Sequence, residues 1–233
     1  MHEKRIAAGK SYPMRKKSEG KFVAVPSPGP HPKNFCIPLG VILRDFLDYS
    51  ENLGEAKKII KLGKILIDGK VKKDHRYPVG IFDVIEIPEI SQAFRAVPGK
   101  KHLDIIEITE KEKNIKICRI DNKSCLKKKK MQLNLNDGKN IISDKKDYKT
   151  GDSLLVELPK LKIKKHVKRG KNSICIVTMG QNKGRVGKIK EIEKTDGSKE
   201  NRIVVDFEDK SVSLPEKFIF VIGEKTPEIK VSK

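Results

Sequence analysis

Apolar residues recur with a helical period just after Pro38, whose fixed backbone angle suits the first turn of a helix. A second helix is predicted from Asn52, because this side chain can cap the helix while Glu55, three residues on, completes a capping box. Gly63 supplies the left-handed residue that ends it. The first helix has one apolar face with the i, i+3, i+4, i+7, i+8 spacing, formed by Leu39, Ile42, Leu43, Phe46 and Leu47.

The second predicted helix separates an apolar side from a basic side when its residues are placed about 100° apart. The apolar side consists of Leu53, Ala56, Ile59 and Ile60. The basic side consists of Lys57, Lys58 and Lys61. We therefore expect the helix to pack through its apolar side and to present a row of lysines to solvent.

A short sheet is predicted after the helices. Residues 64–67 and 70–71 form a strand–turn–strand, because Asp68-Gly69 is a favoured pair for a two-residue hairpin turn. Residues 79–87 supply another strand. Two helices and a small sheet together make one compact domain.

The rest of the chain lacks helical periodicity. Short apolar stretches alternate with polar turns, and Asp137-Gly138 marks one hairpin. Before the helices, four prolines between Pro26 and Pro32 exclude helix and favour an extended path. The fold class is therefore α+β and multidomain: an extended N-terminal arm at 1–36, a helix-and-sheet domain at 37–95, a central β domain at 96–170, a C-terminal β domain at 171–223 and a tail at 224–233.

The charge of the chain is strongly basic and unevenly distributed. It has 52 Lys and Arg residues against 31 Asp and Glu, a formal net charge of +21. Residues 1–36 carry a net +6, residues 37–90 are neutral, residues 91–172 carry +13 and residues 173–233 carry +2. Such an excess indicates a polyanionic partner, with nucleic acid as the first candidate. A generally lysine-rich composition is the alternative, but it does not predict the unevenness.

Other classes of protein fit the sequence poorly. No apolar run approaches the ~18–20 residues of a membrane span, and the first residues lack the apolar core of a signal peptide, so we expect neither export nor a membrane partner. The four cysteines form no CxxC pair and the five histidines have no ligand spacing, so we expect a cytosolic protein without disulfides or metal. No cofactor or small-molecule substrate is indicated.

Catalytic chemistry is not indicated either. Residues 63–70 resemble a phosphate-binding loop only superficially, because the glycines are one residue too far apart and Val71 stands where Ser or Thr is required. We expect that the chain is not an enzyme.

Residues 55–71, EAKKIIKLGKILIDGKV, together with VGIFDVIEI at 79–87 resemble the αL RNA-binding motif, also called the S-four domain. The flanking IPLGVILRDFLDY and the upstream KFVAVPSPGPHP are similar to the archaeal and eukaryotic family of protein four of the small ribosomal subunit. This resemblance covers nearly the whole chain and implies an αL-type RNA-binding domain at 37–95. The chain departs from the family near its start, where AGKSY at 8–12 replaces an expected Ala-Pro-x-x-Trp.

Residues 179–189 are similar to the KOW motif of ribosomal and transcription-elongation proteins, which implies a small SH3-like barrel at 171–223. Gly180, Gly184 and Gly187 permit positive φ and a close approach of the backbone to a ligand. Lys183, Arg185 and Lys188 can supply charge for phosphates. The same residues are also compatible with a tight hairpin that binds nothing.

The resemblance implies a structural component of the small ribosomal subunit, in the cytoplasm, that binds small-subunit ribosomal RNA beside neighbouring ribosomal proteins and supports assembly and translation. Two other functions stay open: a regulatory RNA-binding factor acting on RNA polymerase or stalled ribosomes, and an RNA-modifying enzyme. A pseudouridine synthase carrying the αL motif would need a large catalytic domain with a catalytic Asp in an Arg-Leu-Asp-like context, and the sequence has neither.

The residues predicted to bind RNA are the basic side chains of the arm, of the two helices, of the hairpin region and of the KOW-like turn with its glycines: Arg5, Lys10, Arg15, Lys16, Lys17, Arg44, Lys57, Lys58, Lys61, Lys64, Lys70, Lys72, Lys73, Arg76, Gly180, Lys183, Gly184, Arg185 and Lys188. Residues 127–130, all lysine, are either a solvated loop or a further RNA contact.

Overall fold

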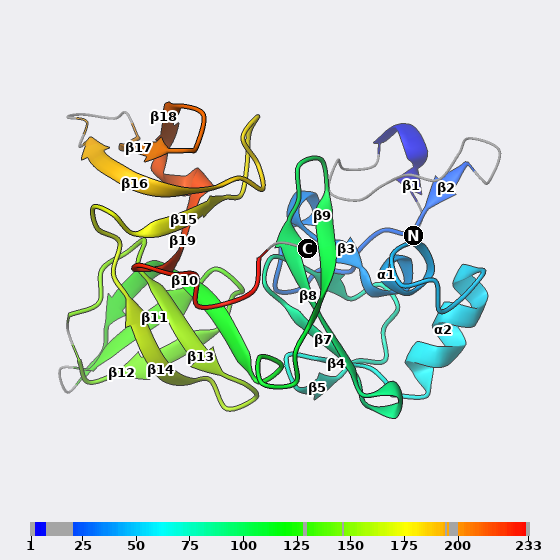
Figure 1. Cartoon of the computed structure of the whole chain (residues 1–233). Coiled ribbons are helices and arrows are strands. Elements are labelled where there is room, and N and C mark those ends of the chain that lie inside the picture. Colours follow the sequence, from blue (N-terminus) through cyan, green and yellow to red (C-terminus); the bar gives the residue numbers. More distant parts are fainter. Residues whose placement is uncertain are drawn as a thin grey trace. The chain divides into compact units, whose positions relative to one another are not determined.

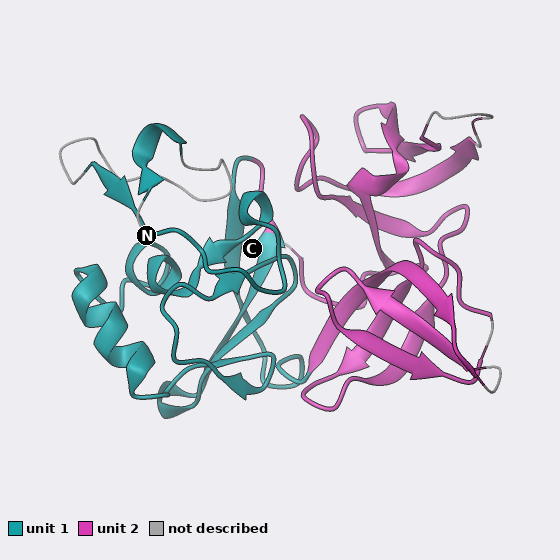
Figure 2. Cartoon of the chain, turned by 180° about the vertical axis from the view of Figure 1, so that it is seen from behind, with its two compact units in different colours: residues 1–97, 101–114, 233 teal, residues 98–100, 115–232 magenta. Residues whose placement is uncertain are grey.

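The computed structural model describes residues 3–7, 21–127, 130–145, 147–193, 195 and 200–231. Strands dominate these residues, and both α-helices of the described chain lie in its N-terminal half (Figure 1). The chain divides into two compact units, the first formed by residues 1–97 and 101–114 and the second by residues 98–100 and 115–232 (Figure 2). Each unit is described by itself.

The first unit is built on a five-stranded sheet with the strand order β5-β4-β7-β8-β9. The strand at Leu103–Ile108, which we expected in the central β domain at 96–170, is instead the edge of this first sheet. The reason is local, because a short turn joins it to the preceding strand and the two lie side by side. The strands are β4 (Leu66–Ile67), β5 (Lys70–Val71), β7 (Val84–Ile87), β8 (Gln92–Pro98) and β9 (Leu103–Ile108).

Helices α1 (Leu39–Asp45) and α2 (Leu53–Lys61) complete this unit. The Asn52 side chain accepts a hydrogen bond from the Glu55 N–H at 3.0 Å, so the predicted cap is confirmed. The Glu55 carboxylate turns back to the N–H of Glu51, also at 3.0 Å, one residue earlier than a standard capping box requires. Gly63 has φ of +76° and ends α2 as predicted.

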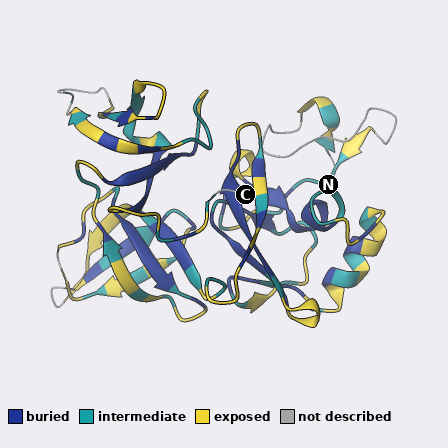
Figure 3. Ribbon diagram, viewed as in Figure 1, coloured by how far each residue is buried: buried dark blue, intermediate teal, exposed yellow. Residues whose placement is uncertain are grey.

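Both helices pack their apolar sides into the core of the first unit (Figure 3). Ala56 and Ile60 of α2 are fully buried, and the predicted turn at Asp68-Gly69 has positive φ at both residues. Two short strand pairs flank this core. They are formed by β1 (Glu3–Lys4) with β2 (Phe22–Val23) and by β3 (Ile37–Pro38) with β6 (Pro78–Val79).

Residues 25–31, which we call the strap, are fastened to the first unit at one end by Arg76. The Arg76 guanidinium donates to the carbonyl of Val25 at 2.9 Å. The N–H of Ser27 donates to the carbonyl of Arg76 at 2.8 Å, and the Ser27 hydroxyl donates to Asp74 at 2.9 Å. Prolines have no N–H to donate, so the strap is held by the carbonyl of Val25 and by the N–H and hydroxyl of Ser27.

The other end of the strap is held by His31. Its Nε2 lies 2.9 Å from the carboxylate of Asp83, and both side chains are buried. The Asp83 carboxylate also accepts the N–H of Gly80 at 2.9 Å. A Cβ at Gly80 would lie 2.2 Å from the His31 ring, so only glycine leaves room for this ring.

The second unit begins with an antiparallel five-stranded sheet in the order β12-β11-β10-β13-β14, which packs around its own core. The predicted hairpin at Asp137-Gly138 joins β11 to β12, and Gly138 has φ of +72°. The strands are β10 (Ile115–Cys125), β11 (Met131–Leu135), β12 (Asn140–Ser143), β13 (Ser153–Glu157) and β14 (Lys162–Val167).

A buried ion pair lies inside this sheet. Lys116 of β10 and Asp137 are almost completely shielded from solvent, and the Lys116 Nζ is 3.0 Å from the Asp137 carboxylate. Lys139 approaches the same carboxylate at 3.1 Å. Burial would raise the pKa of Asp137, but the two ammonium groups outweigh this effect and hold the pKa below its usual value.

A second antiparallel sheet of the same unit follows, in the order β18-β17-β16-β15-β19, with a core formed between its strands. The strands are β15 (Ile174–Val177), β16 (Val186–Glu193), β17 (Arg202–Asp206), β18 (Ser211–Pro215) and β19 (Ile219–Gly223).

Candidate nucleic-acid interface

The lysines of α2 lie on the solvent side of the helix, as its periodicity predicts. Lys58 and Lys61 are exposed and Lys57 is half-buried. No described acidic side chain forms an ion pair with any of the three ammonium groups. These positive charges are therefore available to an external anion.

The segment between β5 and β6 adds further charge beside α2. A Cβ placed on Gly63 would lie 3.2 Å from Cε of Lys73, so the Lys73 side chain passes the end of the helix. Burial lowers the pKa of His75, and the charges of Lys57 and Lys61 lower it further. We call the surface formed by Lys57, Lys61, Lys73 and His75 the α2 face.

Other basic residues that we predicted to bind RNA have partners inside the protein. Lys64 pairs with Glu89 at 2.8 Å. The Arg76 guanidinium holds the strap. Arg44 and Lys72 are also engaged, the first in a two-bond pair with Asp45 at 2.7 and 2.8 Å and the second over the Tyr77 ring at 4.5 Å.

The arm contributes little that can be described. Lys10, Arg15, Lys16 and Lys17 lie outside the described residues. Arg5 begins a short 3-10 helix, and its N–H donates to the carbonyl of Lys21 at 3.1 Å. Lys70 is exposed on β5.

In the KOW-like turn between β15 and β16 the predicted positive φ is confirmed at Gly180 and Gly184 but not at Gly187, which lies in strand β16. Gly180 and Gly184 have φ of +85° and +81°. The N–H of Gly184 donates to the carbonyl of Val177 at 2.8 Å, and the N–H of Lys183 donates to Gly180 at 3.3 Å. Gly187 is buried, and a Cβ there would lie 2.6 Å from Val205. The glycines are thus required by the turn itself.

The charges of this turn are only partly available to a ligand. Arg185 forms an ion pair with Asp209, and its guanidinium lies 4.7 Å from the centre of the Phe207 ring. Lys188 is exposed on β16 and has no ion pair with a described residue. Lys183 is half-buried.

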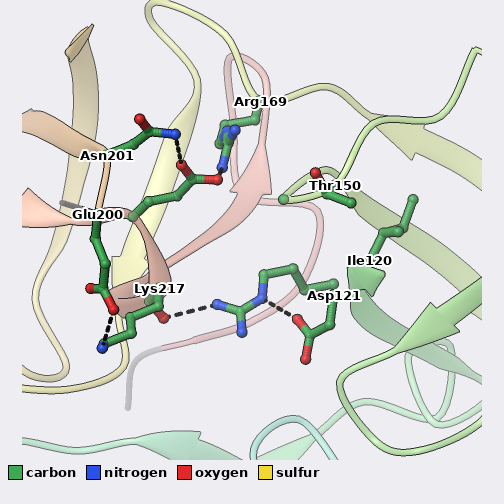
Figure 4. A pocket seen from close by; sticks show the side chains of 10 residues that line it. Ile120, Asp121, Thr150, Arg169, Glu200, Asn201 and Lys217 are labelled. Atoms are coloured by element: carbon green, nitrogen blue, oxygen red, sulfur yellow. Dashed lines mark hydrogen bonds and ion pairs between the residues drawn. The ribbon is translucent and has the colours of Figure 1, made fainter. Parts of the chain in front are cut away.

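A pocket of about 440 Å³ lies between the two sheets of the second unit (Figure 4). It contains three cations and three anions, and these pair with one another. Arg169 pairs with Glu216, Lys217 with Glu200 at 2.6 Å, and Arg119 with Asp121 at 2.7 Å. Its charges therefore cancel, which makes it a joint between the sheets rather than a site for a polyanion.

The pocket also shows how this joint is held. The Arg119 guanidinium donates to the carbonyl of Lys217 at 3.0 Å and to that of Ile219 at 3.3 Å. Burial would raise the pKa of Glu216, but the hydrogen bonds from Arg169 and Asn201 and the charge of Arg169 outweigh it, so the pKa lies below its usual value.

Sequence reasoning missed one group of basic residues. Side chains of β12 and β14 line a groove of about 890 Å³. The lysines around it are Lys145, Lys160, Lys162, Lys164 and Lys165. The net +13 of residues 91–172 was the signal for such a surface, but the strand order that gathers these lysines cannot be read from charge alone.

Metal and membrane sites are not indicated by the described part of the chain. It contains no cluster of His, Cys, Asp and Glu with the arrangement of a metal site. None of its helices has the length and apolar character required to cross a bilayer.

Comparison with known proteins decides the family. The small ribosomal subunit protein eS4 of Methanocella arvoryzae is 42% identical to this chain over 231 residues, which cover 98% of this chain and 96% of the relative. The chain belongs to ribosomal family S4e. A model of this family matches residues 90–163, and a model of the RS4NT (NUC023) domain matches residues 1–34. A member of family S4e is a ribosomal protein and not an enzyme.

Other members of family S4e agree with this assignment. The small ribosomal subunit protein eS4 of Archaeoglobus fulgidus is 38% identical over 97% of this chain and 94% of its own length. The crystal structure of the 30S ribosomal protein S4e from Thermoplasma acidophilum is similar with a TM-score of 0.68 and 30% identity, covering 80% of this chain and 94% of that one. Both proteins are matched over 94% of their own length.

Proposed function

We propose that this S4e chain is a structural component of the small ribosomal subunit that binds ribosomal RNA through the α2 face. The observation that carries the proposal is the set of lysines on that face with no acidic partner among the described residues. Elsewhere in the first unit, cations such as Lys64 and Arg44 are paired within the protein. Lysines that neutralise phosphates release counterions and thereby stabilise the complex.

Each part of the fold has a proposed role. The two helices and the sheet of the first unit act as an αL-type RNA-binding domain, and the sheet β15–β19 acts as an SH3-like KOW domain. At the KOW-like turn, the exposed side chain of Lys188 binds a phosphate. The protein works in the cytoplasm beside neighbouring proteins of the small subunit.

Binding to small-subunit ribosomal RNA at several salt concentrations tests this proposal. We compare the full chain with a variant carrying Lys57→Gln, Lys61→Gln and Lys73→Gln. The slope of log affinity against log salt should fall by about 0.7–0.9 for each phosphate contact that the variant removes, or roughly 2–3 in total. Circular dichroism should show an intact fold, because none of the three side chains lies in the core.

The matched control replaces three lysines that have acidic partners. Lys64→Gln, Lys113→Gln and Lys171→Gln change the net charge by the same amount, but each removes a cation already paired with a glutamate. The control should keep most of the salt slope. Equal slopes in both variants would mean that RNA responds to overall charge and not to the α2 face.

Membership of the subunit is tested separately from RNA binding. In a sucrose gradient at high salt, the protein should remain with the small subunit in a one-to-one ratio. Release into the free protein fraction would favour a transient regulatory factor.

A further inference from the structure

The sheet β12-β11-β10-β13-β14 of the second unit has two edge strands. In its strand order, β12 and β14 are the two ends, so neither has a partner strand of this sheet on its outer side. Residues of both strands nevertheless line one groove of about 890 Å³. We call this groove the seam. Its volume falls in the range of about 300–1,000 Å³ that is usual for ligand sites.

The seam is surrounded by positive charge. Among the described residues that line it, Asp144 is the only acidic one, against five lysines. Lys164 pairs with Glu157 at 3.4 Å and Lys165 pairs with Glu228 at 2.7 Å. The remaining three lysines are exposed and form no ion pair with any described residue: Lys145, Lys160 and Lys162.

The floor of the seam is apolar and fixed. Half-buried Leu161 and Ile163 pack against the core of the sheet. The buried Tyr148 ring meets the His166 ring edge to face, with centroids 4.8 Å apart, and His166 is held by Asp152 at 2.7 Å. Ile142 also lines the seam and is 61% exposed, so it offers an apolar contact to a ligand.

We propose that the seam binds a single-stranded stretch of RNA, with phosphates against Lys145, Lys160 and Lys162 and a base against Ile142. This deepens the proposed function by adding a second RNA site on the other compact unit. The charge of the rim favours a polyanion. An apolar contact with the face of a base favours an unpaired base, since the bases of an A-form duplex stack on one another.

An added peptide strand fits the seam less well, although two sheet edges are present. Strand β12 has only four residues, and β14 carries lysines and a shift of register against β13. Short, lysine-rich or bulged edges are the features that prevent strand addition. The lysines that line the seam therefore disfavour the addition of a peptide strand and attract the phosphates of RNA.

Fluorescence anisotropy of a labelled 12-nucleotide oligouridylate on the full chain tests the site. The seam variant carries Lys145→Gln, Lys160→Gln and Lys162→Gln. Single strands lose about 0.7 of the salt slope per contact, so its slope should fall by about 2. The control is Lys113→Gln, Lys171→Gln and Lys217→Gln, whose lysines have acidic partners, and it should keep the slope.

A second variant, Ile142→Ser, separates base contact from charge. It should weaken oligouridylate binding several-fold at every salt concentration and leave the salt slope unchanged, because it removes an uncharged contact. Circular dichroism should be unaltered, since this side chain is exposed.

The outcomes distinguish the site from the proposed function. Loss of slope in the seam variant, with the control unchanged, supports the seam. An unchanged slope in the seam variant together with a reduced slope in the α2-face variant overturns the seam and leaves the proposed function standing. Two other results also overturn the seam as a single-strand site. One is an equal loss of salt slope in the seam variant for the oligouridylate and for a 12-base-pair RNA duplex. The other is tighter binding of a glutamate-rich decapeptide than of RNA.

Discussion

Replacing Lys116 by methionine would leave the buried carboxylate of Asp137 with one ammonium partner instead of two. Removing one member of a buried ion pair typically costs about 3–5 kcal/mol in stability, because the remaining charge stays buried without a partner that compensates it. Here Asp137 keeps Lys139 at 3.1 Å and also the N–H of Lys139 at 3.2 Å. We therefore expect a loss near the lower end, about 3 kcal/mol in the free energy of unfolding.

A second variant tests the cause of this loss. Lys116→Met combined with Asp137→Leu removes both buried charges, and replacing a buried pair by apolar residues is often neutral or stabilising. The double variant should therefore recover most of the stability. Lys139→Met serves as the control, because Lys139 is partly exposed and its loss should cost about 1 kcal/mol or less.

Urea unfolding followed by far-ultraviolet circular dichroism measures these differences, since the chain has no tryptophan. Amide hydrogen exchange in β10 and β11 should locate the loss in the second unit. Because the pKa of Asp137 is lowered by folding, its contribution is present above about pH 4 and is lost as the pH falls through the folded value. A loss below about 1 kcal/mol for Lys116→Met, or a double variant as unstable as the single one, would refute the reasoning.

Two further predictions concern the α2 face and the KOW-like turn. Lys57→Gln should raise the pKa of His75, measured by NMR titration of the ring proton, because the Lys57 charge is one cause of its lowered pKa. Gly184→Val should lower the stability of the second unit by about 1–3 kcal/mol, measured by urea unfolding, because a β-branched residue is strained at φ of +81° and its Cβ would lie 2.8 Å from the carbonyl oxygen of Pro98. Gly170→Ala is its control, since the added Cβ would meet only the Ser173 hydroxyl at 3.8 Å.

Clear results would contradict either prediction. A pKa of His75 that stays the same in Lys57→Gln would mean that the Lys57 charge does not reach the ring. If Gly184→Val and Gly170→Ala were equally stable, neither the positive φ at Gly184 nor the contact with the Pro98 carbonyl would carry a cost.

The local features of the fold could be predicted from sequence because their causes lie within a few residues. The Asn52 cap, the stop at Gly63 and the turns at Asp68-Gly69 and Asp137-Gly138 each depend on neighbouring side chains or on glycine. The same holds for the row of lysines on α2, which follows from the helical period. The Glu55 carboxylate accepts the N–H of Glu51 and the side-chain amide of Asn52, where a standard capping box would have it accept the Asn52 backbone N–H.

The partners of charged residues could not be predicted, because they come from distant parts of the chain. Arg76 was an expected RNA contact, yet its carbonyl partner Val25 is 51 residues away. Arg185 finds Asp209 across the sheet, 24 residues on. Lys116 belongs to the most basic stretch of the sequence, where nothing local marks it as buried. Composition gives the number of cations, and only strand pairing determines which of them remain available.

The strap has a consequence for how the chain folds during its own synthesis. His31 is made first, but the carboxylate that holds it, on Asp83, follows 52 residues later. At about 5–20 residues per second, the interval is roughly 3–10 s. During this time His31 exists without the carboxylate that holds it in the finished structure. A nascent chain that stops before Asp83 therefore cannot fasten this end of the strap.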